Sequence, residues 1–374
     1  MKEPIDIAEA VPRAFLVGIR DEKVSAREAE SLAAELSGLV YTLGLNIVSS
    51  EVVNVREKSA RYGMGTGKTE ELAQKAASLE ANCIVFDRDI TPSQQRNWEE
   101  LPVCKEAGIS VIDRQELIIQ IFASRAQTRE AELQVKLAEL EYKLPRLQHK
   151  HIDLSQQRGG RYGTKGSGET RLETDRRQVE QRIHKLKKEL EKVKSQRQVR
   201  RKLRERQGIP VCALVGYTNA GKSSLLNALT GAGVLAEDKL FATLDSTSRR
   251  LNLATGKQVL LVDTVGFIRR LPHSLINAFR STLEEVSSAD IVLNIMDASN
   301  PDMKNQYETT LSVLRELDAE TIPMITVLNK VDRLETKDDL ETLLELYPES
   351  SPVSAKNGNG LKELCKRIEN NLKI

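Results

Sequence analysis

Short apolar runs alternate with amphipathic stretches over the first third of the chain. Runs typical of buried strands occupy Ala14–Gly18, Asn46–Val53, Cys83–Phe86 and Ser110–Ile112. Stretches with a helical period lie between and after them, at Ala26–Leu39, Thr69–Leu79, Ser93–Cys104 and Gln115–Ala123. Strands that alternate with helices form parallel sheets covered by those helices. We therefore expect residues 1–124 to fold as an N-terminal α/β domain.

Residues 125–207 show a different pattern, in which apolar residues recur every three or four positions on a charged background. The first set is Leu133, Leu137, Leu140, Leu144 and Leu147, and the second is Val179, Ile183, Leu186, Leu190 and Val193. Each set gives one apolar stripe on a helix. Neither helix can bury its stripe alone, so the pattern predicts an antiparallel helix pair, here called the arm. Pro145 should end or kink the first helix near its tip.

Alternation of strands and helices returns in residues 208–374. Strand patterns occupy Val211–Val215, Arg249–Leu253, Val259–Val262, Ile291–Met296, Met324–Leu328 and Pro352–Val353. Helical stretches separate most of them, which predicts a mainly parallel, doubly wound sheet. Ligands of such sheets bind at the carboxyl ends of the strands.

Charge is distributed unevenly, although the net charge of the 374-residue chain is only +2. The segment Arg182–Arg206 contains 12 lysines and arginines but 3 acidic residues, a net charge of +9. A solvated helix face usually mixes signs, and a segment of one sign is a candidate site for a polyanion. No run of about 18 apolar residues occurs, and the N-terminus has no apolar signal core. We expect a cytoplasmic protein without a membrane span, and we take it to be a monomer.

A glycine-rich loop, residues 155–171, joins the two helices of the arm. Its cations can meet phosphates, and its tyrosine can stack on an unpaired base. A flexible loop that binds nothing has the same composition. The charge of the following helix favours RNA, so the candidate RNA-binding residues are Arg158, Arg161, Tyr162, Lys165 and Arg171.

A second glycine-rich stretch, Arg61–Thr69, contains the letters G-K-T. A phosphate-binding loop would need glycine at position 62, where the chain has Tyr62. We expect a basic surface loop here that can touch RNA, in preference to a second nucleotide site.

The pattern G-x-x-x-x-G-K-S spans Gly216–Ser223, between an apolar strand and a helical stretch. Its glycines let the backbone approach a polyphosphate, and the amides at the helix start attract negative charge. Lys222 can reach the β- and γ-phosphates, and the Ser223 hydroxyl can bind Mg²⁺. The expected phosphate-binding residues are Gly216, Tyr217, Thr218, Asn219, Ala220, Gly221, Lys222, Ser223 and Ser224. A glycine turn that binds nothing is the alternative, and the motifs downstream disfavour it.

Two further segments supply groups for the γ-phosphate and the metal ion. Asp263-Thr264-Val265-Gly266 has the pattern D-x-x-G, in which Asp263 can hold Mg²⁺ through water and the Gly266 amide can contact the γ-phosphate. Upstream, Thr243 can give its hydroxyl to Mg²⁺ and its amide to the γ-phosphate, and only a triphosphate allows this contact. Its neighbours Phe241 and Ala242 are expected to line the site. Thr247 is the alternative, disfavoured because it lies nearer the following strand. The expected catalytic residues are Lys222, Thr243 and Gly266.

The base is selected by Asn329-Lys330-Val331-Asp332, which has the pattern N-K-x-D. The Asp332 carboxylate can accept the N1–H and 2-amino hydrogens of guanine, whereas adenine would leave it unpaired. Asn329 can support the base-binding loop, and the stem of Lys330 can cover the ring. The backbone of Ser354-Ala355-Lys356 can meet the guanine oxygen. These motifs predict GTP and GDP as ligands and a Ras-like P-loop G domain in residues 208–374.

Phe267 follows the D-x-x-G pattern, where many GTPases place a glutamine that orients the attacking water. Phenylalanine cannot orient water by hydrogen bonding. Either hydrolysis is slow until a partner completes the site, or another group positions the water. The alternative is a protein that binds GTP without hydrolysing it.

With these residues in place, the chain resembles the HflX family of ribosome-associated GTPases, in the Obg-HflX group. The most specific stretches are Lys239–Asp245, Asp263–Pro272 and the loop from Arg158 to Thr170. The resemblance implies an N-terminal α/β domain, a helical arm that approaches 23S rRNA near the peptidyl-transferase centre, and a G domain. A hydrophobic residue after D-x-x-G, such as Phe267, is usual in this family. Some members carry a further domain after the G domain, which a chain ending at Ile374 is expected to lack.

The resemblance also implies an activity. It suggests binding to the large ribosomal subunit, separation of stalled or idle 70S ribosomes, and GTP hydrolysis stimulated by the large subunit. In some related GTPases a residue matching Asn219 helps to bind an activating K⁺ ion. Two other interpretations stay open: a non-catalytic module whose arm holds RNA, and a GTPase that acts in ribosome assembly or on another RNA.

Overall fold

The computed structural model describes residues 11–57, 59–150, 167–206, 208–233, 237, 239–270, 275 and 285–372. Contacts divide the chain into two compact units, Met1–Ile121 with Glu139–Gln181, and Phe122–Ala138 with Arg182–Ile374. Among the described helices, none is both long enough and apolar enough to cross a bilayer.

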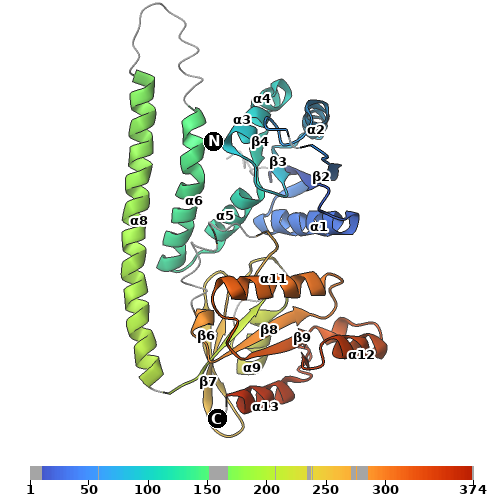
Figure 1. Ribbon diagram of the computed structural model, residues 1–374, viewed down its shortest axis with the longest axis vertical. Coiled ribbons are helices and arrows are strands. Elements are labelled where there is room, and N and C mark those ends of the chain that lie inside the picture. Colours follow the sequence, from blue (N-terminus) through green and yellow to red (C-terminus); the bar gives the residue numbers. More distant parts are fainter. Residues whose placement is uncertain are drawn as a thin grey trace, which may run out of the picture. The chain divides into compact units, whose positions relative to one another are not determined.

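The first unit contains a parallel four-stranded sheet in the order β2-β1-β3-β4. Its strands are β1 (Arg13–Arg20), β2 (Asn46–Asn54), β3 (Cys83–Phe86) and β4 (Ser110–Ile112). Its helices are α1 (Ala26–Leu43), α2 (Thr66–Ser78), α3 (Pro92–Glu99), α4 (Pro102–Ala107) and α5 (Arg114–Arg125). Helices α2, α3 and α4 cover one face of the sheet and α1 covers the other (Figure 1). The predicted parallel α/β domain is thus confirmed.

Two expectations for this unit were wrong in detail. The single helix predicted over Ser93–Cys104 is two helices, because Leu101 is extended before Pro102, which starts α4. The stretch Arg61–Thr69 is only partly a surface loop. Tyr62 and Met64 are buried in the core, where the Trp98 indole N–H donates to the Tyr62 carbonyl (3.0 Å), and α2 begins at Thr66.

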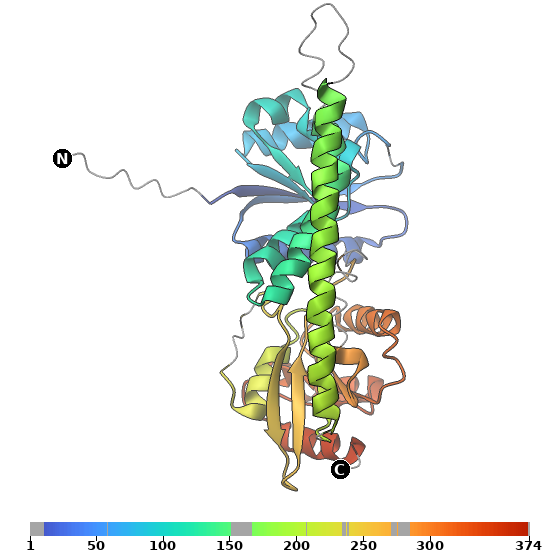
Figure 2. The same cartoon turned by 90° about the vertical axis from the view of Figure 1, so that its left-hand side faces the viewer.

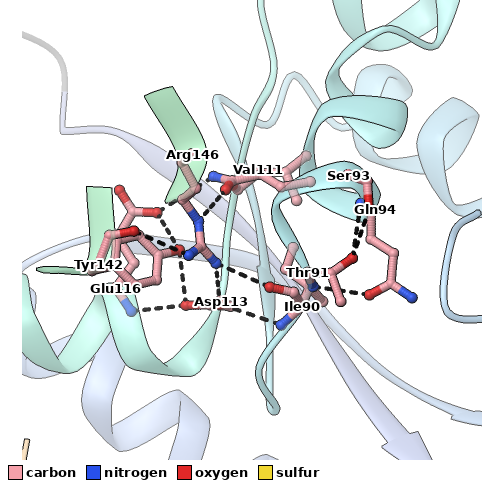
Figure 3. A network of polar contacts seen from close by, with 10 residues as sticks. Ile90, Thr91, Ser93, Gln94, Val111, Asp113, Glu116, Tyr142 and Arg146 are labelled. Atoms are coloured by element: carbon pink, nitrogen blue, oxygen red, sulfur yellow. Dashed lines mark hydrogen bonds and ion pairs between the residues drawn. The ribbon is translucent and has the colours of Figure 1, made fainter. Parts of the chain in front are cut away.

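A buried polar network joins the end of β4 to α6 (Arg129–Lys150) in the first unit (Figure 3). Arg146 donates to Asp113 Oδ2 and to the Ile90 carbonyl, both at 3.0 Å, and its guanidinium stacks on the Tyr142 ring. The Tyr142 hydroxyl contacts Asp113 and Glu116 at 3.1 Å each. Burial raises the pKa of both carboxyls, and Arg146 opposes that shift.

Pro145 was predicted either to end or to kink this helix, and α6 does not end there. The polar network explains why. A proline removes one helical N–H, but Tyr142 and Arg146 on either side of it are held in the network, and the helix continues to Lys150.

The second unit contains a six-stranded sheet in the order β10-β9-β8-β5-β7-β6. All its pairs are parallel except β6 with β7. Its strands are β5 (Val211–Gly216), β6 (Thr247–Asn252), β7 (Gln258–Asp263), β8 (Ile291–Asp297), β9 (Met324–Asn329) and β10 (Ser351–Pro352). Its helices include α9 (Lys222–Thr230), α11 (Met303–Glu316), α12 (Lys337–Leu346), α13 (Leu361–Asn371) and the 3₁₀ turn η1 (Val331–Arg333). The predicted mainly parallel sheet is confirmed.

Alternation along the strands builds a core on each face of this sheet. Cys212 and Leu214 of β5 pack with residues of α9 and α13, whereas Ala213 and Val215 pack with residues of α11. Figure 1 shows α11 on one side of the sheet and α9 and α13 on the other. This doubly wound arrangement directs the ends of β5, β7, β8 and β9 to one edge, where ligands bind.

The second helix of the arm, α8 (Ser167–Arg206), is continuous over 40 residues (Figure 2). Two ion pairs within the second unit join it to the first turn of α6: Arg129 with Glu189 at 3.0 Å, and Arg197 with Glu130 at 2.9 Å. Four stripe positions that lie in this unit are buried: Leu133, Leu137, Ile183 and Leu186. Leu190 and Val193 in the same unit are half-buried, and the packing of one stripe on the other stays a prediction.

Candidate nucleotide-binding site

The phosphate-binding loop between β5 and α9 requires glycine at two motif positions. Gly216 has φ +141°, and a Cβ there would lie 2.2 Å from the Ile295 carbonyl oxygen. Gly221 has φ +90°, and a Cβ there would lie 2.3 Å from the Asn329 amide nitrogen. Side chains are excluded at both positions by strain and by overlap. The loop backbone is therefore held close against β8 and β9, with the start of α9 open to an anion.

A pocket lies over this loop and is lined by residues of the loop, of the segment that contains Thr243, and of D-x-x-G. Its lining residues are Thr218, Asn219, Gly221, Lys222, Ser223, Ser224, Glu237, Lys239, Phe241, Ala242, Thr243, Thr264 and Gly266. Glu237 and Lys239 had not been predicted from any motif. Three predicted phosphate-site residues, Tyr217, Ala220 and Val265, are buried and do not line this pocket.

Lys222 is held inside the loop that it would serve. Its side chain is only 6% exposed, and its ammonium donates to the carbonyls of Tyr217 (2.8 Å) and Gly216 (3.2 Å). Burial lowers the pKa of Lys222 to about 8, a shift that Asp263 opposes and Lys330 assists. The group is thus charged at pH 7, and a phosphate would supply the counter-charge that the pocket does not fully provide.

Ser223, Thr243 and Asp263 meet beside the pocket. The Ser223 hydroxyl donates to Asp263 Oδ2 (2.6 Å) and lies 2.8 Å from the Thr243 hydroxyl. Asp263 ends β7 and is fully buried, and burial raises its pKa above the ordinary value. Its Oδ1 atom has no hydrogen-bond partner among the residues that the structure describes. Two hydroxyls and an acidic oxygen left unpaired fit a hard divalent cation such as Mg²⁺. Thr247, the alternative to Thr243, instead starts β6.

The D-x-x-G segment is tied to the phosphate-binding loop by its backbone. The Phe267 amide donates to the Gly216 carbonyl (3.0 Å), and the Thr218 amide donates to the Phe267 carbonyl (2.7 Å). A Cβ at Gly266 would lie 2.8 Å from the Lys222 ammonium, so the Gly266 backbone borders the pocket. The ring of Phe267 is 1% exposed and packs with Val215 and Val292 in the core. Phe267 therefore supports the segment and points no polar group at the pocket.

Three motifs distant in sequence meet around the expected base site. The Asn329 amide nitrogen donates to the Ala220 carbonyl (2.9 Å), and its oxygen accepts from the Ala355 amide (3.1 Å). The Ser354 hydroxyl donates to the Asp332 carboxylate (2.6 Å). Asn329 thus joins the phosphate-binding loop to the last motif, and Ser354 orients the carboxylate expected to read guanine. The side chain of Lys356 is exposed.

Asp297 lies beside the base-binding motif and had not been predicted from the sequence. Lys330 donates to Asp297 Oδ2 and to the Asn219 carbonyl, both at 2.7 Å. Asp297 ends β8, so the rule that ligand sites lie at the carboxyl ends of strands could have pointed to it. Its carboxylate places the ammonium of Lys330 and leaves the stem of that residue beside the loop.

Most of the candidate RNA-binding residues cannot be placed. Arg158, Arg161, Tyr162 and Lys165 lie outside the described residues, and Arg171 lies in α8 but its side chain is not described. The basic segment Arg182–Arg206 can be followed in part. Five of its cations are exposed: Arg182, Lys185, Lys187, Lys188 and Lys192.

Comparison with protein families divides the chain into three matched regions. The family described as "GTP-binding GTPase N-terminal" matches residues 30–123, and "GTP-binding GTPase Middle Region" matches residues 125–204. The family described as "50S ribosome-binding GTPase" matches residues 211–330.

Individual relatives cover nearly the whole chain. "GTPase HflX" of Akkermansia muciniphila is 47% identical over 367 residues, which are 95% of this chain and 83% of that protein. "GTPase HflX" of Escherichia coli (strain K12) is 40% identical over 342 residues, which are 90% of this chain and 78% of that protein. The crystal structure of SsGBP with GDP has a TM-score of 0.52 and 23% identity, and the match covers 97% of this chain and 99% of that one, a likeness of fold. On these relatives and on the three matched regions, the chain belongs to the HflX family of GTPases.

Proposed function

We propose that this HflX-family GTPase binds the large ribosomal subunit through 23S rRNA, hydrolyses GTP when the subunit stimulates it, and separates stalled or idle ribosomes into subunits. The observation that carries the nucleotide part is the meeting of Ser223, Thr243 and Asp263 beside Lys222. Support for the ribosomal part comes from the family description of residues 211–330 and from the charge of α8.

GTP binding would use the groups that already converge on the pocket. Lys222 would exchange the carbonyls of Gly216 and Tyr217 for the β- and γ-phosphates. The amides at the start of α9 would face the same phosphates. Asp332, oriented by Ser354, would accept both donors on the guanine edge. The Gly266 amide would meet the γ-phosphate, which a diphosphate lacks.

The metal ion has a matching set of ligands. Ser223 and Thr243 would hold Mg²⁺ directly and Asp263 through water, and the ion when bound would neutralise charge on the phosphate oxygens. Asn219 has φ +63° and lines the pocket, and we propose it as part of a K⁺ site. Equal hydrolysis rates in sodium and potassium salts would contradict that second ion.

The attacking water requires a group that the described part of the site does not place. Phe267 is buried in the core, so its side chain cannot orient water in this arrangement. We therefore propose that hydrolysis is slow in the free protein and that the ribosome either supplies the missing group or moves one of this chain into position.

We propose that the exposed cations of α8 contact phosphates of rRNA, and alanine substitutions test this. Replacing Lys185, Lys188 and Lys192 by alanine removes three charges from exposed positions of one helix. If each meets a phosphate, affinity for the large subunit should fall by roughly tenfold or more at physiological salt. The slope of log affinity against log salt should flatten by about 2 to 3. Co-sedimentation with purified subunits at several salt concentrations measures both.

The matched control removes the same charge from the other helices of the second unit. Lys304, Lys362 and Lys366 are exposed on α11 and α13, and their alanine triple variant should keep the wild-type affinity and slope. Equal losses of subunit affinity in the two triple variants, or no loss in either, would contradict α8 as the rRNA contact.

Ribosome separation distinguishes the proposed function from the assembly-factor alternative. Light scattering of 70S particles should fall when the wild-type protein and GTP are added. Subunit binding with unchanged scattering would favour an assembly factor or a GTP-dependent RNA-binding protein.

A further inference from the structure

A segment between the phosphate-binding loop and β6 borders the pocket on one side and the start of the arm on the other. This switch segment is defined here as residues 237 and 239–245. Glu237, Lys239, Phe241, Ala242 and Thr243 line the pocket. The segment also contacts residues 122–128, which lead directly into α6, and all of these residues belong to the second unit.

Asp245 makes the most specific of these contacts. Its Oδ2 atom accepts from the backbone N–H groups of Gln127 (3.0 Å) and Thr128 (3.2 Å), and its Oδ1 atom accepts from the Thr128 hydroxyl. Thr128 in turn caps α6, because its hydroxyl oxygen accepts from the Ala131 amide (3.2 Å). One carboxylate therefore holds the residue that begins the arm. Its negative charge also lies at the positive end of the helix dipole.

Two contacts on the same side reinforce this attachment. The ring of Phe241 packs edge to face on Phe122, with centroids 4.7 Å apart and planes at 83°. Arg125 pairs with Glu237 at 2.8 Å. Phe241 is 2% exposed and has φ +54°, a conformation that a bulky side chain adopts only when its surroundings hold it there. The switch segment is thus kept in a strained form by contacts with the residues that precede α6.

The residues after Thr128 continue the connection to the basic helix. Arg129 pairs with Glu189 (3.0 Å), and Glu130 pairs with Arg197 (2.9 Å). Both partners lie in the segment Arg182–Arg206 that carries a net charge of +9. Contacts and short stretches of chain therefore lead from Thr243, which meets Ser223, to Asp245 two residues on, and from there through Thr128 and its neighbours to α8.

We infer that Asp245 is a positioning residue that couples the nucleotide state of the switch segment to the start of the arm. Thr243 is two residues away, so a contact from Thr243 to the metal ion and γ-phosphate fixes Asp245 against Gln127 and Thr128. With a diphosphate that contact is lost and the strained segment can leave, which exposes the amides of Gln127 and Thr128. Because coupling is reciprocal, an RNA that binds the arm also changes the preference for GTP over GDP. This last step rests on the proposed function, whereas the coupling within the chain does not.

Hydrogen–deuterium exchange of the full-length protein tests the coupling directly. In the wild type, peptides that cover residues 123–133 should exchange about tenfold more slowly with Mg²⁺ and a non-hydrolysable GTP analogue than with Mg²⁺ and GDP. In Asp245→Ala this difference should disappear while both nucleotides still bind. The same nucleotide-dependent difference in Asp245→Ala, or none in the wild type at saturating nucleotide, would overturn the inference.

Two further variants separate coupling from general damage. Asp290 accepts from the Val211 amide (2.7 Å) in the same unit, away from the switch segment, so Asp290→Ala should keep the difference. Thr128→Ser keeps the capping hydroxyl and should also keep the nucleotide-dependent exchange difference. Thr128→Val lacks that hydroxyl and should show a smaller difference. If the wild type shows the exchange difference but no subunit binding, the coupling stands and the proposed function fails. If Asp245→Ala still binds subunits and keeps the exchange difference, the coupling fails and the proposed function stands.

Discussion

The Asp332→Asn variant is expected to exchange its preference for GTP for a preference for xanthosine triphosphate. The Asp332 carboxylate has only acceptors, which match the N1–H and 2-amino donors of guanine. Asparagine has one acceptor and one donor group, and its donor would face the 2-amino group and leave both unpaired. Unpaired buried polar groups cost about 1–3 kcal/mol each, so GTP affinity should fall by roughly 100-fold or more. Xanthine carries oxygen at position 2 and restores the pairing.

Competition against a fluorescent nucleotide, with GTP, xanthosine triphosphate and ATP as competitors, measures this exchange. Ser354→Ala is the matched control, because it removes only the hydroxyl that orients the carboxylate. It should weaken GTP binding without creating affinity for xanthine. An Asp332→Asn protein that still prefers GTP would show that another group reads the base.

The Lys222→Ala variant is expected to lose most of its affinity for GTP. Lys222 is the buried cation of the loop, and charge-assisted hydrogen bonds contribute about 1.5–3 kcal/mol each. Losing those to two phosphates should weaken GTP binding by at least about 100-fold, and turnover should vanish with it. The ammonium is costly to bury without nucleotide, so the variant should melt at the wild-type temperature or above. Normal GTP affinity would contradict the assigned role, and the exposed Lys257→Ala serves as control.

The lowered pKa of Lys222 adds a pH dependence to the same prediction. With a pKa of about 8 in the free protein, the ammonium is charged at pH 7 and loses its proton as the pH rises through 8. Phosphate binding favours the charged form, so GTP affinity should fall about twofold from pH 7 to 8 and then more steeply, approaching tenfold per pH unit. Lys222→Arg keeps its charge and should show weaker binding without this fall between pH 8 and 9. A flat wild-type profile over that range would contradict the shifted pKa.

The sequence could predict the sheets and the nucleotide motifs because both depend on short spacings. The motif predicts glycine at positions 216 and 221. The structure shows why: a Cβ at either position would overlap neighbouring atoms of Ile295 or Asn329. Thr243 could be preferred to Thr247 from its distance to the next strand, and it meets Ser223. Asp297 belongs to no motif, so only the folded sheet reveals that it holds Lys330.

Contacts between segments that are distant in the sequence could not be predicted from it. Asp245 and Thr128 are 117 positions apart, and neither sits in a pattern that names the other as its partner. Tyr62 reads as part of a basic glycine-rich loop, yet Trp98 holds its backbone and buries its ring. Pro145 was expected to end or kink α6, and the helix continues past it where Asp113, distant in the sequence, fixes Tyr142 and Arg146. These contacts join residues far apart in the sequence, so local patterns do not reveal them.

We propose that the large ribosomal subunit completes the hydrolytic site. It is tested most directly by measuring GTP turnover of the wild-type protein alone, with purified small subunits and with purified large subunits. We expect slow turnover alone and with small subunits, and a rate at least about tenfold higher with large subunits. Equal turnover in the three samples, or none in any of them, would contradict it.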